Sequence, residues 1–352
     1  MSAKHPLIAL GLGLVLGAFS IPAFAQNDSS VVAEIAGRKV TTEELEQKQG
    51  GKLLQARYKY YLAERDALDQ FIDDQLLEMQ AKREGVTLDE LYKRHVAINV
   101  PEPTEDQLRF YYEGVQTEES FESARPNIIE TVRQIRTKKA RDAYIAELRG
   151  QYGVVVELSQ PSARVEVGSD PRLGPDKAPV QIVEFADYEC PYCQKVNEDL
   201  IRLREQFGDQ VSIVYKDFPL PMHPLAPKAA EAARCAGVQG KFWEFHDSLF
   251  QTKKLQVSDL KQEAVALKLD PTRFNQCLEG GEQIAPVKKD SQEGQRIGLQ
   301  GTPSFFINGH FMSGAIGYGK LRETVLDELN AMTAARKQTA ALVPAQTATA
   351  KK

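Results

Sequence analysis

The hydrophobic and polar positions divide the chain into two halves with different periodicities. In the first half, apolar residues recur mostly every three or four positions, which is typical of amphipathic helices. The longest helices are predicted over 52–83 and over 126–149, the latter with Pro126 in its first turn. Thr104 and Gln107 form a capping box at the start of a shorter helix between them. Strands are predicted near the two ends of this half, at 31–41 and 152–158.

The second half alternates short apolar runs with helical patterns, and this alternation predicts an α/β domain. It follows a segment rich in Pro, Gly, Ser and Asp, residues 159–179, which predicts a linker with a short edge strand at Arg164–Val167. The predicted elements are strand 180–186, helix 191–207, strand 211–217, a helical stretch over about 225–298, strands 303–308 and 310–314, and helix 318–333. Residues 334–352 are expected to form a frayed or disordered tail.

The first 25 residues have the pattern of a secretory signal peptide. A short basic start is followed by the apolar run "LIALGLGLVLGAFS" and by "AFA" at 23–25, which predicts cleavage before Gln26. The alternative is an uncleaved anchor, although the apolar run is short and carries three glycines. We therefore expect a soluble protein in the periplasm or secreted. The expected order is signal peptide 1–25, helical domain 26–158, linker and edge strand 159–179, α/β domain 180–333 and tail 334–352.

Composition narrows the range of partners and cofactors. The chain has 44 Lys and Arg against 49 Asp and Glu, and no basic block favours nucleic acid as a partner. Export to an oxidising compartment favours disulfides. The four cysteines are Cys190, Cys193, Cys235 and Cys277. No metal, flavin or nucleotide cofactor is expected.

Cys190 and Cys193 form a CPYC motif directly after a predicted strand, at the start of a predicted helix. The unpaired N–H groups and positive dipole end of a helix stabilise a thiolate. Cys190 is therefore predicted to be the exposed attacking thiolate and Cys193 the more buried resolving thiol. A zinc site is one alternative, but it needs four ligands and no second Cys or His pair stands at a suitable spacing. A purely structural disulfide is the other alternative, and it would close a tight loop.

A second motif, "LQGTPSFFING" at 299–309, places Thr302 and Pro303 just before a strand-like run. Together with "VEFADYECPYC" and the helical segment between them, it resembles the DsbA-type branch of the thioredoxin superfamily. The resemblance implies an α/β thioredoxin fold with a helical insertion, a cis Pro303 against the cysteine pair, and Thr302 offering backbone hydrogen bonds to substrate. It also implies that Glu184 is the buried acid that assists proton transfer to Cys193. The alternatives are an ordinary trans proline and a solvated Glu184.

The sequence leaves the direction of electron flow open. Some DsbA-type oxidants carry a histidine inside the CxxC motif, where this chain has Tyr192. CPYC with Thr before the proline also resembles the DsbG and DsbC isomerase–reductases, which work as dimers. His223 is interpreted as a turn histidine, with a position facing the redox site as the alternative. His246 is assigned to the core.

Cys235 and Cys277 lie in predicted helices. If they pair, they close a long loop, and the chain-entropy model gives a stabilisation on the order of 3–4 kcal/mol. If they do not, they act as small buried apolar residues. The oxidising compartment favours a structural disulfide.

Residues 31–158 resemble the core of SurA/PrsA-type exported chaperones. The matching stretches are "VVAEIAGRKVTTEELE", "PTEDQLRFYYEG" and the segment 120–158. Many relatives insert a parvulin prolyl-isomerase domain between the last two, but here only a few residues separate them, so no prolyl-isomerase activity is expected. The module is expected to hold unfolded chains or to form a homodimer, with a passive scaffold as the alternative.

These patterns predict an exported thiol–disulfide oxidoreductase that forms or rearranges disulfides through Cys190 and Cys193. Its expected partners are unfolded or cysteine-containing exported proteins, and a membrane or soluble redox partner that resets the cysteine pair. The alternative function is a redox-independent chaperone or assembly factor that binds unfolded chains.

Overall fold

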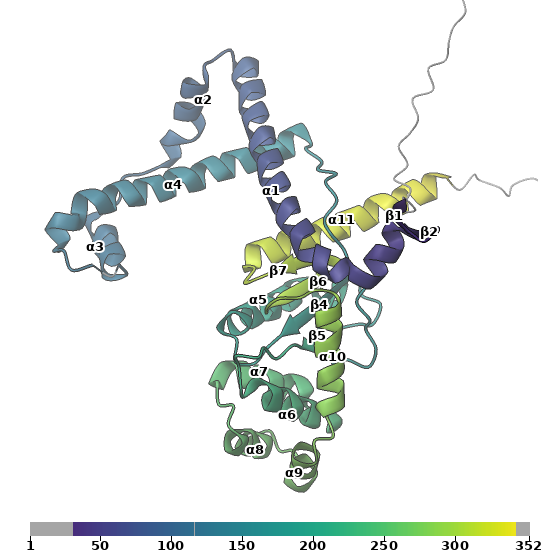
Figure 1. Cartoon of the computed structure of the whole chain (residues 1–352). Coiled ribbons are helices and arrows are strands. Elements are labelled where there is room, and N and C mark those ends of the chain that lie inside the picture. Colours follow the sequence, from purple (N-terminus) through teal and green to yellow (C-terminus); the bar gives the residue numbers. More distant parts are fainter. Residues whose placement is uncertain (1–30, 116, 343–352) are drawn as a thin grey trace, which may run out of the picture. The chain divides into compact units, whose positions relative to one another are not determined.

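The computed structural model describes residues 31–115 and 117–342, and these separate into two compact units between Gly50 and Gly51 (Figure 1). The predicted signal peptide lies outside the described residues. In the first unit, β1 (Val31–Ile35) pairs antiparallel with β2 (Arg38–Thr41). Ala36 and Gly37 connect them with positive φ angles of 50° and 81°, as expected for a tight hairpin turn. One helix, α1 (Thr42–Glu84), then runs through the boundary between the units.

The N-terminal region is mainly helical, as predicted. Besides α1 it contains α2 (Leu88–His95), the short 3-10 helix η1 (Ala97–Asn99), α3 (Glu105–Glu113) and α4 (Phe121–Tyr152). Complete capping boxes begin α2 at Thr87 and α3 at Thr104, so the capping box predicted from Thr104 and Gln107 is confirmed. Leu76, Leu91 and Leu148 share one buried apolar cluster of α1, α2 and α4.

Two predictions for α4 were wrong. The helix begins at Phe121 because the Ser120 side chain accepts a hydrogen bond from the Ser123 amide, so Pro126 lies inside the helix and not in its first turn. At the other end, Gly153 adopts the left-handed conformation that stops a helix. The apolar run that predicted a strand at 152–158 therefore follows this cap without joining a strand ladder in the described structure.

The second half is built on a five-stranded sheet, counted over the described residues, with strand order β3-β5-β4-β6-β7. The strands are β3 (Arg172–Leu173), β4 (Val180–Ala186), β5 (Val211–Asp217), β6 (Ser304–Ile307) and β7 (His310–Ser313). β4 runs parallel to β5, and the other pairs are antiparallel. α5 (Pro191–Phe207) and α11 (Tyr318–Leu342) bury apolar residues, including Leu200 and Leu321, in the same cluster as the sheet.

A helical insertion between β5 and β6 forms the lower part of this half in Figure 1. It consists of α6 (Ala226–Val238), α7 (Phe242–Thr252), α8 (Val257–Ala266), α9 (Pro271–Gly280) and α10 (Ile284–Arg296). Its apolar residues share a buried cluster with the sheet residues Ala186 and Tyr215. A disulfide joins Cys235 of α6 to Cys277 of α9, and both residues are buried.

Two boundaries in this half differ from prediction. The edge strand is β3, since Arg172 and Leu173 pair with β5, whereas Val165 and Val167 of the expected strand 164–167 pack against the core as irregular backbone. α11 continues to Leu342, so the expected tail is helical over 334–342. Its remaining residues, 343–352, lie outside the described residues.

Candidate active site

Cys190 lies where β4 gives way to α5. It is the N-cap residue of the helix, and Pro191 occupies the first turn, where a missing N–H leaves no helical hydrogen bond unmade. Cys193 follows one turn in and is fully buried. Both cysteines are free thiols in this structure. The strand-to-helix transition predicted from the sequence thus places the pair at the positive end of α5.

The Thr302–Pro303 peptide bond is cis, and it lies directly against Cys190. The Cys190 thiol donates to the carbonyl oxygen of Thr302 at a Sγ–O distance of 3.4 Å. This contact helps to explain one difference from prediction. Cys190 was expected to be exposed, but it is only 5% exposed because neighbouring segments cover the start of α5.

The surroundings of Cys190 favour its thiolate. The Cys193 thiol, which donates to Cys190 Sγ, lowers the pKa of Cys190 to about 5, while burial acts in the opposite direction. The Thr302 side chain and the backbone amides of Tyr192 and Cys193 lower the pKa further. Burial raises the pKa of Cys193 well above its usual value. The two thiols are therefore polarised in opposite directions, one toward the anion and one toward the protonated form.

Glu184 lies in the central strand β4, between β5 and β6, and is 2% exposed. Burial raises the pKa of Glu184 to about 8, and the negative charge of Cys190 acts in the same direction. Its Oε1 atom has no hydrogen-bond partner among the described residues. The carboxyl group is thus a neutral acid near pH 7, electrostatically coupled to Cys193.

The turn before Cys190 is pinned to the loop that leads into α6. Asp187 Oδ2 accepts a hydrogen bond from the Leu220 amide at 2.7 Å and lies 2.8 Å from His223 Nδ1. Glu189 Oε2 accepts from the amides of Leu225 and Ala226. Burial lowers the pKa of His223, but its contacts with Asp187 outweigh this effect, and the net shift is upward. His223 therefore stands in a turn, and Asp187 ties that turn to the cysteine motif.

A cavity of about 200 Å³ opens beside Cys190. The apolar side chains of Leu225, Phe250 and Leu255 contribute to its lining, and the exposed Lys253 stands at its edge. It brings residues of the helical insertion next to the thiol. No group of three or more His, Cys, Asp or Glu side chains arranged for a metal ion occurs in the part of the chain that the structure describes.

The structure brings together Cys190, Cys193, Thr302, Pro303 and Glu184, which the sequence singled out, while the Cys235–Cys277 disulfide joins two helices of the insertion. Sequence reasoning missed three groups. Asp187 was not considered, although it stands three residues before Cys190. Tyr188 and Tyr215 were not noticed either, because a tyrosine in or near an apolar strand is indistinguishable from a core residue.

Comparison with known proteins agrees with this architecture. Residues 166–327 match the family model described as Thioredoxin. The C-terminal half is a thioredoxin-fold domain. The fold class predicted from the sequence, an α/β thioredoxin fold with a helical insertion after a mainly helical region, is therefore confirmed.

Curated relatives match about half of the chain or less. The Na(+)/H(+) antiporter NhaA 3 of Salinispora tropica is 36% identical over 176 residues, which is 49% of this chain and 26% of that protein. The antiporter NhaA of Herminiimonas arsenicoxydans is 35% identical over 143 residues, 40% of this chain and 23% of its own length. This chain thus spans about a quarter of the length of the curated relatives it matches. None of the described helices is long and apolar enough to cross a membrane.

Solved structures are similar to about half of this chain. Oxidised BdbD of Bacillus subtilis is 26% identical with a TM-score of 0.45, covering 49% of this chain and 98% of that one. The thiol-disulfide exchange protein α-DsbA2 of Wolbachia pipientis is 23% identical with a TM-score of 0.42, covering 46% of this chain and 87% of that one.

Proposed function

We propose that this chain is an exported thiol–disulfide oxidoreductase that exchanges disulfides with secreted or periplasmic proteins through Cys190 and Cys193. The observation that carries the proposal is the position of Cys190 as the N-cap of α5, with its Sγ 3.4 Å from the carbonyl oxygen of Thr302. A stabilised thiolate with a second thiol one turn away is the arrangement that disulfide exchange requires. The thioredoxin match over 166–327 supports the same chemistry.

In the oxidising direction, a substrate thiolate attacks Sγ of Cys190 in the Cys190–Cys193 disulfide. That S–S bond breaks, a mixed disulfide with Cys190 forms, and Cys193 leaves as a thiolate that takes up a proton. A second substrate thiolate then attacks the substrate sulfur of the mixed disulfide and releases Cys190. The substrate loses two electrons, which the cysteine pair gains, and a redox partner in the same compartment must remove them again.

The pKa of Cys190 favours donation of disulfides over reduction. A thiol whose pKa is lowered to about 5 stabilises the reduced form of the pair at neutral pH, and this makes the disulfide form a stronger oxidant. The protein would then act as a disulfide donor for exported proteins that carry cysteines. An isomerase uses the same residues but begins from the reduced pair, with Cys190 attacking first.

Substitution of Cys190 tests the proposal. Reduced, denatured ribonuclease A is refolded with the oxidised protein, with Cys190→Ser, and with Cys193→Ser as a matched variant. The wild-type protein should restore ribonuclease activity and Cys190→Ser should not. Cys193→Ser, mixed with a disulfide-containing substrate, should trap a mixed disulfide that mass spectrometry detects. Full refolding activity in Cys190→Ser would overturn the proposal.

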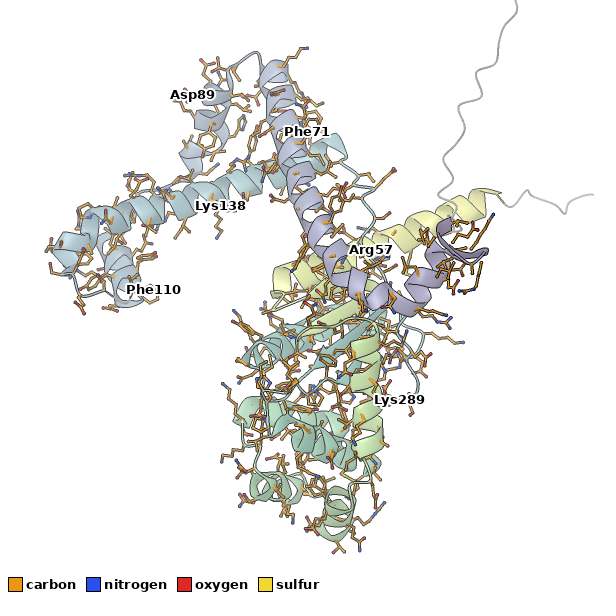
Figure 2. All side chains as sticks on the ribbon, in the orientation of Figure 1. Arg57, Phe71, Asp89, Phe110, Lys138 and Lys289 are labelled. Atoms are coloured by element: carbon orange, nitrogen blue, oxygen red, sulfur yellow. A yellow bond between two sulfur atoms is a disulfide. The ribbon has the colours of Figure 1, made fainter. Side chains whose placement is uncertain are left out.

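A second candidate function is a redox-independent chaperone, and the N-terminal helices supply the observation that favours it. Large apolar side chains stand exposed on these helices, among them Phe71 at 63% and Phe110 at 81%, both labelled in Figure 2. Exposed apolar groups can bind unfolded chains or a second copy of the protein. A chaperone role predicts that Cys190→Ser still suppresses aggregation of unfolded proteins, whereas Phe71→Ser combined with Phe110→Ser weakens that suppression.

A further inference from the structure

Several polar atoms are buried beneath Cys193 without a hydrogen-bond partner. The hydroxyl groups of Tyr188 and Tyr215 interact with each other, and Glu184 Oε1, Asp217 Oδ1 and His246 Nε2 have no partner in the described structure. Each of these five side chains is at most 4% exposed. Buried polar groups are nearly always paired, and leaving one unpaired costs free energy of folding. Three such atoms beside a pair of buried phenols require an explanation other than packing.

The five side chains form a connected group. Glu184 and Tyr215 are partners in the parallel register of β4 and β5, so their side chains stand on the same face of the sheet. Asp217 follows two residues after Tyr215 and shares that face. The ring of Tyr188 lies 5.4 Å from the ring of Tyr215, and the ring of His246 lies 4.7 Å from it. Tyr215 thus stands at the centre and contacts both aromatic neighbours.

One end of the group meets the thiols. Glu184 and Tyr215 both interact electrostatically with Cys193, and Glu184 also interacts with Cys190. The groups that face Glu184 are therefore the two thiols at the start of α5, Tyr188 in the turn before it and Tyr215 on β5. On the other side, β6 presents Phe305, which has no titratable group.

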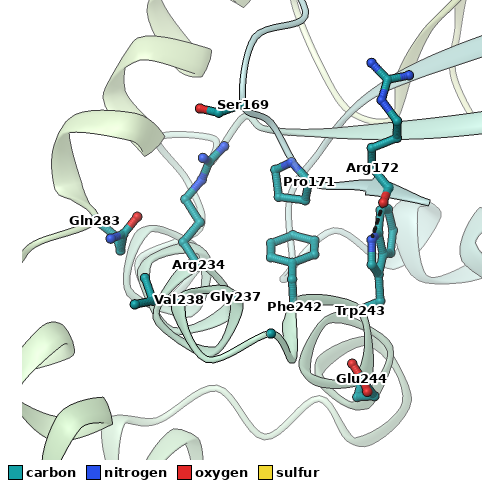
Figure 3. Close-up of a pocket in the computed structure, with 11 residues that line it drawn as sticks. Ser169, Pro171, Arg172, Arg234, Gly237, Val238, Phe242, Trp243, Glu244 and Gln283 are labelled. Atoms are coloured by element: carbon teal, nitrogen blue, oxygen red, sulfur yellow. Dashed lines mark hydrogen bonds between the residues drawn. The ribbon is translucent and has the colours of Figure 1, made fainter. Parts of the chain in front are cut away.

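The other end of the group lies next to residues that line a surface cavity of about 420 Å³. Arg234 lines that cavity, and its guanidinium pairs with Asp217. Phe242 and Trp243 also line it, with ring centroids 5.8 Å and 5.1 Å from His246. Figure 3 shows these side chains, with Trp243 Nε1 donating to the carbonyl oxygen of Arg172. The buried group therefore lies between the thiols and a cavity that opens to solvent.

We propose that Tyr188, Tyr215, Asp217 and His246 form a proton relay that connects Glu184 and Cys193 with the cavity lined by Arg234 and Trp243. Phenol, carboxyl and imidazole groups each donate and accept protons, and water commonly bridges buried polar atoms that have no protein partner. The inference rests on the proposed thiol–disulfide exchange and assigns a positioning role to side chains that touch no substrate.

The relay serves the step in which Cys193 acts. When the reduced protein attacks a disulfide, a mixed disulfide with Cys190 forms and one substrate thiolate leaves. Cys193 then loses its proton to Glu184 in the fraction of molecules in which that carboxyl group is ionised at neutral pH, attacks Sγ of Cys190, and expels the second substrate thiolate. The Cys190–Cys193 disulfide carries away no proton, so Glu184 must release the one it received. Because Glu184 is buried, release to solvent requires a path, and the relay provides it.

Single-turnover reduction of oxidised glutathione by the reduced protein tests this inference. The first glutathione leaves when Cys190 attacks, and the second leaves when Cys193 attacks, so the two releases separate the steps. Tyr215→Phe removes only the hydroxyl at the centre of the relay. Tyr144→Phe is the matched control, because Tyr144 Oη is buried without a partner in the described structure but lies on α4.

We expect Tyr215→Phe to slow the second release by about tenfold, less than the roughly 10²–10⁴-fold contribution of a direct general base. The solvent deuterium isotope effect on that release should increase, and the first release should keep its rate. Tyr144→Phe should leave both release rates and the isotope effect unchanged. If Tyr215→Phe does not fold, Tyr188→Phe takes its place with the same expectation. Wild-type rates for the second release in the folded variant would overturn the relay alone. A wild-type protein that releases no glutathione would instead overturn the proposed function, and the relay with it.

Discussion

Cys190 Sγ lies 3.4 Å from the carbonyl oxygen of Thr302, although 112 residues separate the two in the sequence. The contact brings the start of α5 against the start of β6 and so joins the two sequence motifs into one site. The chemistry of the Cys190 thiol therefore depends on both segments.

The first prediction concerns the thiolate of Cys190. Because the Cys193 thiol and Thr302 lower its pKa to about 5, the absorbance of the thiolate at 240 nm should titrate with a midpoint near that pH, using Cys190→Ser as the blank. Thr302→Val removes a hydroxyl and should raise the midpoint, since Thr302 stabilises the anion. A midpoint close to the ordinary thiol value of 9.0 in the wild-type protein would contradict this assignment.

A second prediction follows from the linkage between protonation of Cys190 and the stability of the fold. The folded pKa of Cys190 is lowered to about 5 from 9.0, so between these pH values the unfolded reduced protein binds more protons than the folded one. The thiolate should therefore stabilise the reduced protein fully above about pH 9 and lose this contribution as the pH falls toward 5. Urea unfolding of reduced wild type and of Cys190→Ser across this range measures the difference. A difference that does not vary with pH would count against a stabilised thiolate.

The third prediction concerns Glu184, whose pKa is raised on folding, whereas that of Cys190 is lowered. Its pKa rises from 4.5 to about 8 on folding, so stability is lost as the pH rises from 4.5 through 8. Glu184→Gln should remove this cost, and the variant should gain stability over wild type as the pH increases across that window. The same variant should release the second glutathione more slowly, because Cys193 loses its proton acceptor. If Glu184→Gln were less stable than wild type at pH 8, the ionised carboxylate would be stabilised in the fold, which would contradict the raised pKa.

Much of the site follows from the sequence. The strands 180–186 and 211–217 and the helix 191–207 match β4, β5 and α5, because apolar runs bounded by Cys-Pro and Gly define their ends sharply. The edge strand was misplaced because Arg172–Leu173 is only two residues long, too short to show alternation. Pro126 was placed in a first turn because the Ser120 cap gives no apolar signal.

The buried polar group is the part that the sequence conceals. Glu184 was singled out through a family resemblance, but Tyr215 and Asp217 come from another strand, and His246 comes from the insertion. Their proximity depends on the register of β4 with β5 and on the packing of α7 against them. Neither the register nor the packing angle is specified by local periodicity.

A fourth prediction concerns the disulfide in the insertion. Cys235 and Cys277 tie α6 to α9 within the buried cluster that also contains Cys190 and Cys193. Replacing both with Ala should lower the free energy of unfolding by about 2–5 kcal/mol, the usual cost of losing a native disulfide. Thermal unfolding of the double variant measures the loss. Glutathione release should keep its wild-type rate below the melting temperature, and a large loss of that rate would show that the pair takes part in exchange.

The reduction potential of the Cys190–Cys193 pair decides whether this protein donates disulfides. The oxidised protein is equilibrated with glutathione buffers, and mass spectrometry of alkylated peptides follows this pair separately from Cys235 and Cys277. The lowered pKa of Cys190 predicts a potential between about −120 and −180 mV, the range of disulfide donors and isomerases. A potential near about −270 mV, the value of a reductase, would contradict disulfide donation. A pair that does not exchange with glutathione at all would contradict thiol–disulfide chemistry at this site.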